Sequence, residues 1–327
     1  MRSPLITVIT AVRNGERYLG ETIASIQAQT VQDWEYLIVD DASTDKTAEL
    51  VREAAARDPR IKLVRRTESG GPYIAANDAL HLSQGRYIMR TDGDDLQPPD
   101  RFASQLAFLE TNPQYKACVT YWQAFDERGL TPGSIVTIPT PRAFKWYLLF
   151  RGASVHSSLC IEREVLERAG GYRALPLSQD YRLLCQLTQQ GVLGVLPAVL
   201  SHVRIHENRS TNLRAALQKQ LAQEVLRDHW QAMTGSSCSD ADVAALWAVG
   251  YSLPFDLRAG LHMLARWDAL WRNDSTLDRH ERDELAGLTA LRRRKFLRSN
   301  LRRDPVRTVL AACGAGFLAL PALLATR

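Results

Sequence analysis

The sequence predicts an α/β fold with a mostly parallel sheet, followed by a helical region. Short apolar runs alternate with segments of helical periodicity over the first 90 residues, and polar residues gather where the apolar runs end. This alternation is typical of a parallel sheet flanked by helices. From residue 213 to residue 300 the apolar residues recur at helical spacing.

Each element of the first half has its own signal. The strand-like runs are residues 5–10, 35–39, 61–64 and 87–89. The intervening helices are expected around Tyr18 to Ile26, from a cap at Ser43 or Thr44 to about Arg57, and from Pro72 through Leu80. We therefore expect four parallel strands before residue 90.

Composition narrows the class of protein. The chain has 327 residues, 45% apolar and 24% charged, which is ordinary for a globular protein. Its five cysteines include no Cys-x-x-Cys pair, which argues against a zinc site or disulfide framework and fits a reducing cytosol. The first apolar run is too short for a signal peptide.

Acidic residues follow two of the predicted strands. Asp92, Asp94 and Asp95 come directly after residues 87–89, and Asp40 and Asp41 end residues 35–39. The carboxyl ends of parallel strands share one edge of a sheet, where ligands bind in such folds. Mg²⁺ and Mn²⁺ prefer carboxylate and phosphate oxygens, so the pattern indicates a divalent cation carrying a phosphate ester. The alternative is a solvated acidic turn.

Residues 5–96 resemble the nucleotide-sugar half of family 2 glycosyltransferases with the GT-A fold. The matching motifs are Val8-Ile9 through Asn14-Gly15, Tyr18-Leu19, residues 25–30, Val39 to Asp45, and Asp92-Gly93-Asp94-Asp95. Residues 97–212 resemble the acceptor half, through His156 to Leu159, Gly170-Gly171-Tyr172, Gln179-Asp180-Tyr181 and Val203 to His206. The resemblance therefore predicts a GT-A domain over residues 1–212.

The resemblance implies the roles of the donor-side residues. Its nucleotide-sugar contacts would be Ala11, Arg13, Asp40, Asp41, Asn77, Asp92 and Gly93. Asp94 would ligate Mn²⁺ or Mg²⁺, with His206 as a weaker candidate ligand. Ala11 and Arg13 depart from the family, in which Pro and Tyr are common. Ala76 stands where relatives carry an Arg, and Arg13 is a candidate to supply that cation.

On the acceptor side, the resemblance implies inversion at the anomeric carbon with Asp180 as the general base. Gln179 replaces the Glu that precedes this Asp in the family, so only Asp180 of the pair can titrate. His156 is a candidate for lining the acceptor pocket. The alternative interpretation of Asp180 is a helix N-cap.

The C-terminal third contains a helical region, residues 213–300, and a segment, residues 301–327, that we expect to associate with a membrane. Eight basic residues and one acid lie between Arg292 and Arg307, and residues 308–325 carry no charge. The cations fit the cytoplasmic flank of a membrane segment. The alternative is a buried core helix. Four tryptophans are expected in the core or at an interface, with a base-stacking platform as the alternative: Trp230, Trp247, Trp267 and Trp271.

The leading hypothesis is an inverting glycosyltransferase at the cytoplasmic face of the cell membrane, either peripheral or anchored by its C-terminal segment. Its expected partners are a nucleotide-sugar donor, with a UDP-sugar as the leading candidate, and a saccharide or lipid-linked acceptor of surface polysaccharide or glycolipid synthesis. A metal-dependent phosphatase or nucleotidyltransferase is the second hypothesis. The third is a basic membrane- or nucleic-acid-binding module without enzymatic activity; the leading hypothesis expects no nucleic acid partner.

Overall fold

The computed structural model describes residues 3–150, 156–172, 175, 177–207 and 215–303. The chain divides into two compact units. Unit 1 comprises Met1–Pro141 with Ala153–Leu221, and unit 2 comprises Arg142–Gly152 with Ala222–Arg327. The domain boundaries expected from the sequence, at residues 212 and 300, stay predictions.

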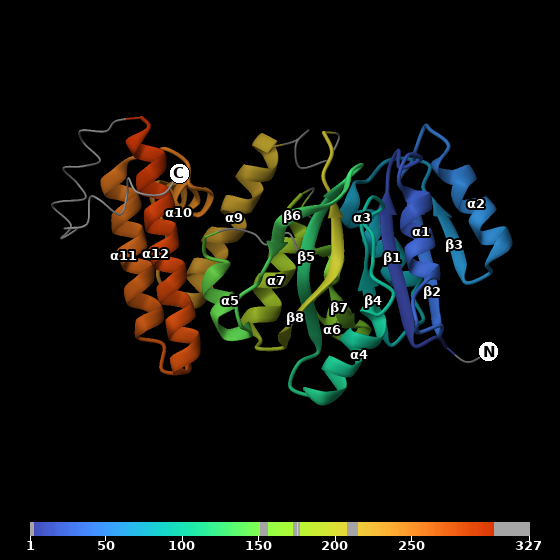
Figure 1. Cartoon of the computed structure of the whole chain (residues 1–327), viewed down its shortest axis with the longest axis horizontal. Helices are drawn as coiled ribbons and strands as arrows, with labels where there is room; N and C mark the ends of the chain where they lie inside the picture. The colour runs from blue at the N-terminus through green and yellow to red at the C-terminus, as the bar shows by residue number, and fades with distance from the viewer. Residues whose placement is uncertain (1–2, 151–155, 173–174, 176, 208–214, 304–327) are drawn as a thin grey trace. The chain divides into compact units, whose positions relative to one another are not determined.

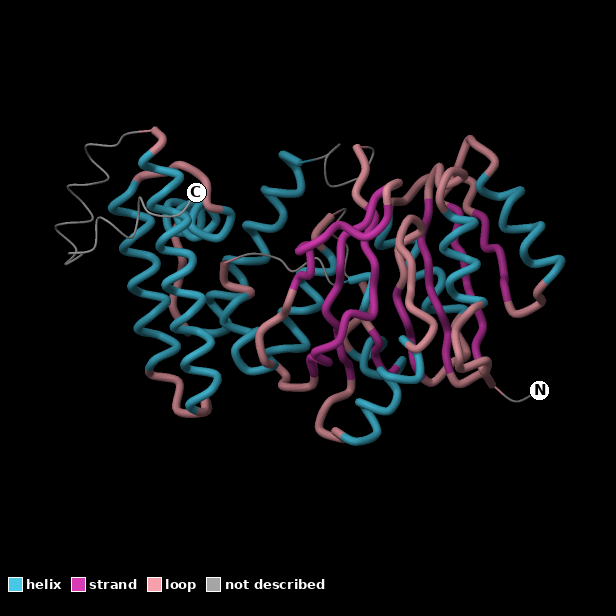
Figure 2. Tube along the Cα trace, viewed as in Figure 1, coloured by secondary structure: helices cyan, strands magenta, loops and turns pink. Residues whose placement is uncertain are grey.

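Unit 1 is built on one sheet, whose strands follow the order β3-β2-β1-β4-β7-β5-β6, with β8 paired to β5 (Figures 1 and 2). The strands are β1 (Ile6–Val12), β2 (Trp34–Asp40), β3 (Ile61–Arg65), β4 (Tyr87–Arg90), β5 (Ala117–Asp126), β6 (Gly129–Val136), β7 (Cys160–Glu162) and β8 (Leu193–Arg204). The four strands predicted before residue 90 are confirmed, to within two residues at each end.

The strand directions decide where the site lies. β1 runs parallel to β2 and β4, and β2 runs parallel to β3. β7 is antiparallel to both β4 and β5, so β5 runs in the same direction as β4, and β8 is parallel to β5. The carboxyl ends of β1, β2, β4, β5 and β8 therefore share one edge of the sheet, which we call the carboxyl edge. The prediction of a mostly parallel, mixed sheet is confirmed.

Helices of unit 1 bury their apolar faces against this sheet. They are α1 (Leu19–Gln27), α2 (Thr47–Arg57), α3 (Pro72–Leu82), α4 (Arg101–Thr111), α6 (Arg163–Arg168) and α7 (Gln179–Gln189), with a 3-10 turn η1 (His156–Ser158). Ile23 of α1 and Phe102 of α4 join Val8, Tyr36 and Met89 of the strands in one buried cluster. Apolar side chains at helical and alternating spacing meet in this way because each element hides one face from water.

The expected cap of α2 is wrong. The residue before the helix is Lys46, and no side chain of that residue caps it. The Asp45 carboxylate accepts a bond from the Thr47 amide instead, at 3.0 Å. Ser43 is occupied elsewhere, since its hydroxyl accepts a bond from the Asn14 amide at 2.8 Å. Ser43 thus ties the turn after β1 to the turn after β2.

Unit 2 is helical, as expected for residues 213–300. It contains α5 (Pro141–Tyr147, from Arg142 on), the larger part of α9 (Ala215–Thr234), α10 (Asp240–Tyr251), α11 (Leu257–Arg272) and α12 (Arg279–Leu301). α10 and α12 each begin with a capping box, Ser239 with Asp242 and Asp278 with Glu281. The four tryptophans expected in the core are buried there.

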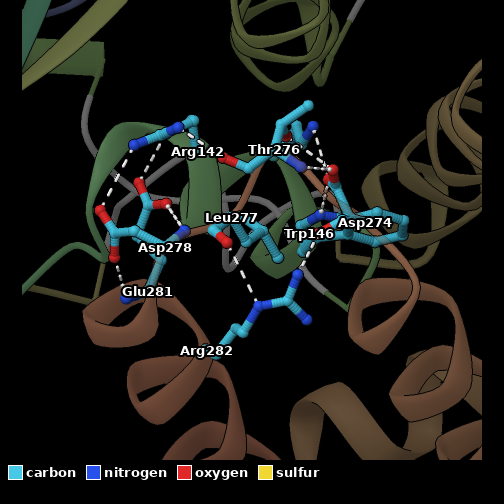
Figure 3. Close-up of polar contacts among 9 residues, drawn as sticks. Arg142, Trp146, Asp274, Thr276, Leu277, Asp278, Glu281 and Arg282 are labelled. Atoms are coloured by element: carbon cyan, nitrogen blue, oxygen red, sulfur yellow. Dashed lines mark hydrogen bonds and ion pairs between the residues drawn. The ribbon is translucent and has the colours of Figure 1, made fainter.

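Side chains of α5 hold the loop between α11 and α12 (Figure 3). Arg142 Nε donates to Glu281 Oε1 at 2.9 Å, and the same guanidinium donates to the Thr276 carbonyl. Trp146 Nε1 and Lys145 Nζ each lie 3.0 Å from Asp274 Oδ2. Burial would raise the pKa of Asp274, but these donors and Thr276 bring it far below its usual value. Arg142, Lys145 and Trp146 thus tie α5 to the loop before α12 within unit 2.

The basic run near the C-terminus is not wholly a surface feature. Arg292 is buried and donates from Nη1 to the Gly250 carbonyl at 2.8 Å, so it belongs to the core of unit 2. Arg294, Lys295, Arg302 and Arg303 are exposed. The apolar residues 308–325 lie outside the described residues. Over the part of the chain that the structure describes, no helix is both long and apolar enough to cross a bilayer.

A buried arginine joins α4 to the strands that carry the acidic residues. Arg101 is fully buried, and its guanidinium donates to Gln105 Oε1 at 2.9 Å, Thr91 Oγ1 at 3.2 Å, and the carbonyls of Arg90 and Leu159 at 3.0 and 3.3 Å. Burial lowers its pKa to about 10, which still leaves it charged at neutral pH. Arg101 therefore holds the end of β4 and the start of β7 in place.

We predict that Arg101→Met lowers the free energy of unfolding by about 3 kcal/mol or more, because two buried carbonyls and one hydroxyl lose a charged donor. Urea unfolding followed by circular dichroism measures this difference. The matched control is Arg57→Met in α2, where the side chain is 78% exposed. Equal stability of the two variants would show that Arg101 does not hold the strands.

Candidate active site

The carboxyl edge brings together the acidic residues expected from the sequence. Asp40 ends β2, and Asp92, Asp94 and Asp95 follow β4, its neighbour across β1. The turn after β4 is tight at Gly93, where an added Cβ would lie 3.1 Å from Val12 Cγ2 of β1. A larger residue would press against that strand. The small residue therefore lets Asp92 and Asp94 turn back over the sheet.

Asp41 is bound by the loop that precedes α3. Its carboxylate accepts bonds from Ser69 Oγ at 2.7 Å, the Gly70 amide at 2.8 Å and the Gly71 amide at 2.9 Å. Burial would raise the pKa of Asp41, but these bonds and the nearby Arg66 guanidinium lower it below its usual value. Asp41 is thus a charged residue that shapes the loop 69–71.

Asp40 is fully buried and only partly satisfied. Its Oδ1 accepts a bond from the Ser43 amide at 2.9 Å. Its Oδ2 lies 3.4 Å from Arg65 Nε but makes no hydrogen bond with the described part of the chain. Arg13, at the end of the first turn, donates from Nη1 to Ser69 Oγ at 3.1 Å and is exposed. Ala11, in β1, is half-buried beside Val39 at the same edge.

Asp92 is paired with a buried cation. Arg90 lies in β4, and its Nη2 is 3.1 Å from Asp92 Oδ1 while its Nη1 donates to the Ile9 and Thr91 carbonyls at 2.9 and 3.1 Å. The Asp92 amide donates to Ser157 Oγ at 3.1 Å. Asp92 keeps a side chain that is 44% exposed. Arg90 therefore balances the charge of Asp92, while part of the Asp92 carboxylate stays in contact with solvent.

Asp94 contacts residues at the carboxyl end of β8 and just after it. His206 Nε2 lies 2.9 Å from Asp94 Oδ2, and the His206 ring packs against Tyr18 with 4.9 Å between ring centroids. Arg204 Nε donates to the Asp94 carbonyl at 2.9 Å, and the Arg204 amide donates to Asp95 Oδ1 at 3.0 Å. The structure thus brings together Asp94 and His206, the two residues that we expected to lie near a metal.

Asp95 is buried behind this pair. Burial raises its pKa well above the usual value, and the charges of Asp94 and Asp92 act in the same direction. Hydrogen bonds from Ser157 and from the Arg204 amide oppose that rise. Asp95 is therefore an internal group of the turn, in contrast to the more exposed Asp94.

The possible metal ligands are few. Across the described residues, no three His, Cys, Asp or Glu side chains group together in a way that could hold an ion. The Asp94 carboxylate and His206 Nε2 are partly exposed, at 30% and 17% of their side chains. A hard divalent ion commonly takes one or two protein ligands and completes its shell with phosphate oxygens and water. The two residues fit such a site.

Asp180 lies in the first turn of α7. The residue before that helix is Ser178, so the N-cap interpretation of Asp180 is wrong. Burial raises the pKa of Asp180 to about 6, and the charge of Asp92 adds to this effect, while the backbone amide of Tyr181 opposes it. The adjacent Gln179 has a buried Oε1 with no hydrogen-bond partner among the described residues. Asp180 is thus a carboxylate that can exchange a proton near neutral pH.

His156 and Asn77 lie around Tyr172. His156 Nε2 is 3.2 Å from the Tyr172 hydroxyl, and burial, aided by the charge of Arg90, lowers the pKa of His156 to about 3. Asn77, in α3, donates from Nδ2 to the Tyr172 carbonyl at 2.7 Å and accepts from the Tyr172 amide at 2.8 Å. His156 is therefore neutral, and both polar groups of Asn77 bind the Tyr172 backbone.

Two functional residues were not expected from the sequence. Arg90 and Arg204 are buried cations that contact Asp92 and the Asp94 turn, respectively. The signal in each case was an arginine within an apolar strand, Tyr87 to Arg90 and Val203 to Ile205. A buried charge in that position is costly unless it is paired, so an arginine within an apolar strand indicates a buried partner.

Comparison with known proteins agrees with this architecture. Residues 7–168 match the model of "Glycosyl transferase family 2". The chain is 32% identical over 197 residues to EpsE of Bacillus subtilis (strain 168), a protein named as a candidate glycosyltransferase, and the match covers 58% of this chain and 69% of that protein.

Two solved structures share the fold. S. aureus TarS 1–349 in complex with UDP-GlcNAc has a TM-score of 0.61 and 18% identity, covering 92% of each chain. The mannosyltransferase PcManGT from Pyrobaculum calidifontis, in complex with GDP-Man and Mn²⁺, has a TM-score of 0.56 and 22% identity, covering 98% of this chain and 88% of that one. The GT-A fold expected from the sequence is confirmed, and the chain belongs to glycosyl transferase family 2.

Proposed function

We propose that this glycosyltransferase moves a sugar from a nucleotide-sugar donor, a UDP-sugar in our leading hypothesis, to a saccharide or lipid-linked acceptor with inversion at the anomeric carbon. The observation that carries the proposal is Asp180, a carboxylate with a pKa raised to about 6 that lies within electrostatic reach of Asp92 at the carboxyl edge. Family membership makes the phosphatase and non-enzymatic hypotheses unnecessary.

The donor would lie across the ends of β1, β2 and β4. The exposed carboxylate of Asp92 is a candidate for a ribose contact, and Asp40, whose buried Oδ2 makes no hydrogen bond among the described residues, is a candidate for a nucleotide contact if the donor reaches it. Asp41 would act through the loop 69–71 that it holds. Arg13 is a cation at the edge of that loop, suited to phosphate. The solved relatives with UDP-GlcNAc and GDP-Man leave both nucleotides as candidates.

A divalent ion fits the donor set that Asp94 and His206 present. The Mn²⁺ complex of the related mannosyltransferase supports this proposal. Asp94 would hold the ion with its carboxylate, and His206 would either add a ligand or orient that carboxylate through their 2.9 Å contact. The bound ion would neutralise the charge that develops on the leaving diphosphate.

The proposed reaction is a single displacement. The acceptor hydroxyl oxygen forms a bond to the anomeric carbon while the bond from that carbon to the diphosphate oxygen breaks. The nucleoside diphosphate departs with the electron pair, and Asp180 takes the hydroxyl proton. Attack from the face opposite the leaving group inverts the anomeric carbon. One titratable carboxylate is sufficient, so Gln179 does not prevent the reaction.

Membrane attachment and a role in surface polysaccharide or glycolipid synthesis are the finer part of the proposal. The relative named "Putative teichuronic acid biosynthesis glycosyltransferase TuaG" of Bacillus subtilis (strain 168), 39% identical over 106 residues, supports that direction. Exposed Arg302 and Arg303 at the end of α12 are suited to anionic headgroups. The catalytic unit would then work at the cytoplasmic face of the membrane.

We predict that Asp94→Asn abolishes metal-dependent donor binding while the fold survives, because an amide is a poor ligand for Mg²⁺ or Mn²⁺. Hydrolysis of a panel of UDP- and GDP-sugars identifies the donor, and titration calorimetry with that donor and Mn²⁺ measures binding. Glu53→Gln, on the exposed surface of α2, is the control. Unchanged affinity in Asp94→Asn would show that Asp94 holds no metal.

We predict that Asp180→Asn keeps donor affinity but lowers turnover by roughly 10²–10⁴, the contribution of a positioned base. In the wild type, turnover should fall as pH drops below about 6, where Asp180 becomes protonated. The variant should lack that dependence. An equal loss of donor binding would instead identify Asp180 as a nucleotide-site residue.

The same substitution should change stability in a defined direction. The folded-state pKa of Asp180, about 6, lies above its usual value of 3.8, so the folded protein binds more protons between those pH values. Stability from this group is therefore lost as pH rises through that window. Asp180→Asn should melt at a higher temperature than wild type at pH 7 and at the same temperature below pH 4. A lower melting temperature at pH 7 would contradict the burial argument.

We predict that the full chain sediments with membranes in high salt and is released by detergent, because cations and an apolar segment would both bind the bilayer. A chain that ends at Asn300 should be soluble and still hydrolyse donor, since Asp94 and Asp180 precede the deletion. It should lose activity on a membrane-embedded acceptor. A full chain that is monodisperse without detergent would remove the support for membrane attachment.

A further inference from the structure

Asn77 binds the chain on the acceptor side through both ends of its amide. Its Nδ2 donates to the Tyr172 carbonyl at 2.7 Å, and its Oδ1 accepts from the Tyr172 amide at 2.8 Å. The two residues are 95 positions apart in the sequence. A side-chain amide that pairs with both backbone groups of one residue fixes that residue in position and in orientation.

The residue before Tyr172 is adapted to this contact. Gly171 has a φ of +64°, a conformation that favours glycine. A Cβ at this position would lie 2.6 Å from Asn77 Oδ1. Any side chain here would push the Asn77 amide away, so the glycine permits the close approach. We call the contact between Asn77 and the Gly171-Tyr172 backbone the amide clamp.

The amide clamp continues toward the catalytic carboxylates. The Tyr172 hydroxyl lies 3.2 Å from His156 Nε2. Ser157, next to His156, accepts the bond from the Asp92 amide at 3.1 Å. The charge of Asp180 also acts on the Tyr172 hydroxyl. Tyr172 is thus held at its backbone by Asn77 of α3 and at its hydroxyl by His156 of η1.

The start of α3 belongs to the donor side. The amides of Gly70 and Gly71, just before Pro72, bind the Asp41 carboxylate. α3 therefore carries a donor-side loop at its start and the amide clamp in its second turn. One rigid helix of 11 residues links the two halves of the reaction.

We propose that Asn77 is a positioning residue that sets the Gly171-Tyr172 backbone, and with it the acceptor side of the site, relative to the donor. This inference rests on the proposed transfer reaction. It assigns Asn77 a role different from direct nucleotide contact, because both hydrogen-bonding groups of its amide are already used. Replacing Asn77 should therefore lower the rate of sugar transfer and leave donor binding unchanged.

The test compares Asn77→Ala with wild type in three measurements. Hydrogen exchange should show faster exchange of the Tyr172 amide, whose acceptor is lost. Calorimetry with UDP and with GDP, each with Mn²⁺, should show unchanged affinity. Turnover of the sugar nucleotide that wild type uses best, with its acceptor, should fall by roughly 10²-fold, the effect of a misplacement of about 1 Å. Donor KM should not change.

Two further variants keep the test decisive. Asn77→Asp retains an oxygen that can accept from the Tyr172 amide but sets a carboxylate oxygen against the Tyr172 carbonyl oxygen, so repulsion should lower turnover at least as much as Asn77→Ala does. Gly171→Ala should impair turnover from the other side of the clamp. Asn77→Ala removes the oxygen with which that Cβ collides. The fold-decrease in turnover of the double variant should therefore be smaller than the product of the two single fold-decreases. Leu82→Ala, 51% exposed on the same helix, is the control.

The outcomes that overturn the inference are separate from those that overturn the proposed function. Parallel losses of nucleotide affinity and turnover in Asn77→Ala would make Asn77 a nucleotide ligand. Unchanged exchange at Tyr172, or unchanged turnover, would show that Asn77 positions nothing. If wild type binds neither UDP nor GDP, the proposed function fails, and the exchange measurement alone still decides whether Asn77 holds the loop.

Discussion

The charge at the carboxyl edge is the constraint on which the rest of unit 1 depends. Asp92, Asp94 and Asp95 would repel one another unless cations and hydrogen-bond donors balanced them. Arg90 supplies one cation from inside β4. Arg204 supplies a second from the end of β8, where it also pairs with Glu21 of α1 at 2.8 Å. The acidic turn is therefore supported both by Arg90 of its own strand and by β8, a strand from the second half of the unit that ends beside it.

The acids at this edge fall into two groups according to what satisfies them. Asp41 and Asp95 receive several donors from the protein and shape its loops. Asp92 and Asp94 each meet one basic side chain and keep 44% and 30% of their own side chains exposed. Only the second group has oxygens open to a ligand without a change in the fold. This division follows from hydrogen bonding and could not be read from the aspartates themselves.

Whether a feature could be predicted from the sequence depends on how far apart in the chain its residues lie. The strands and helices of the first 90 residues were predictable because apolar periodicity is a local signal, and the acids were predictable because parallel strands end at one edge. The pairing of His206 with Asp94 spans 112 positions, and no local pattern encodes it. The same holds for Arg142, which joins unit 2 through contacts 134 to 139 positions away. The family resemblance placed His206 near the acids, but Arg90 and Arg204 required the structure.

Arg90 links these observations, because one buried cation acts on three neighbouring groups. It pairs with the Asp92 carboxylate at 3.1 Å. It opposes the rise in the pKa of Asp180 that burial and Asp92 cause, and so favours the ionised carboxylate at neutral pH. It also lowers the pKa of His156, which keeps the imidazole that binds the Tyr172 hydroxyl uncharged. A neutral side chain at position 90 would leave Asp92 unbalanced and Asp180 closer to its acid form, although every acidic residue of the motif would still be present.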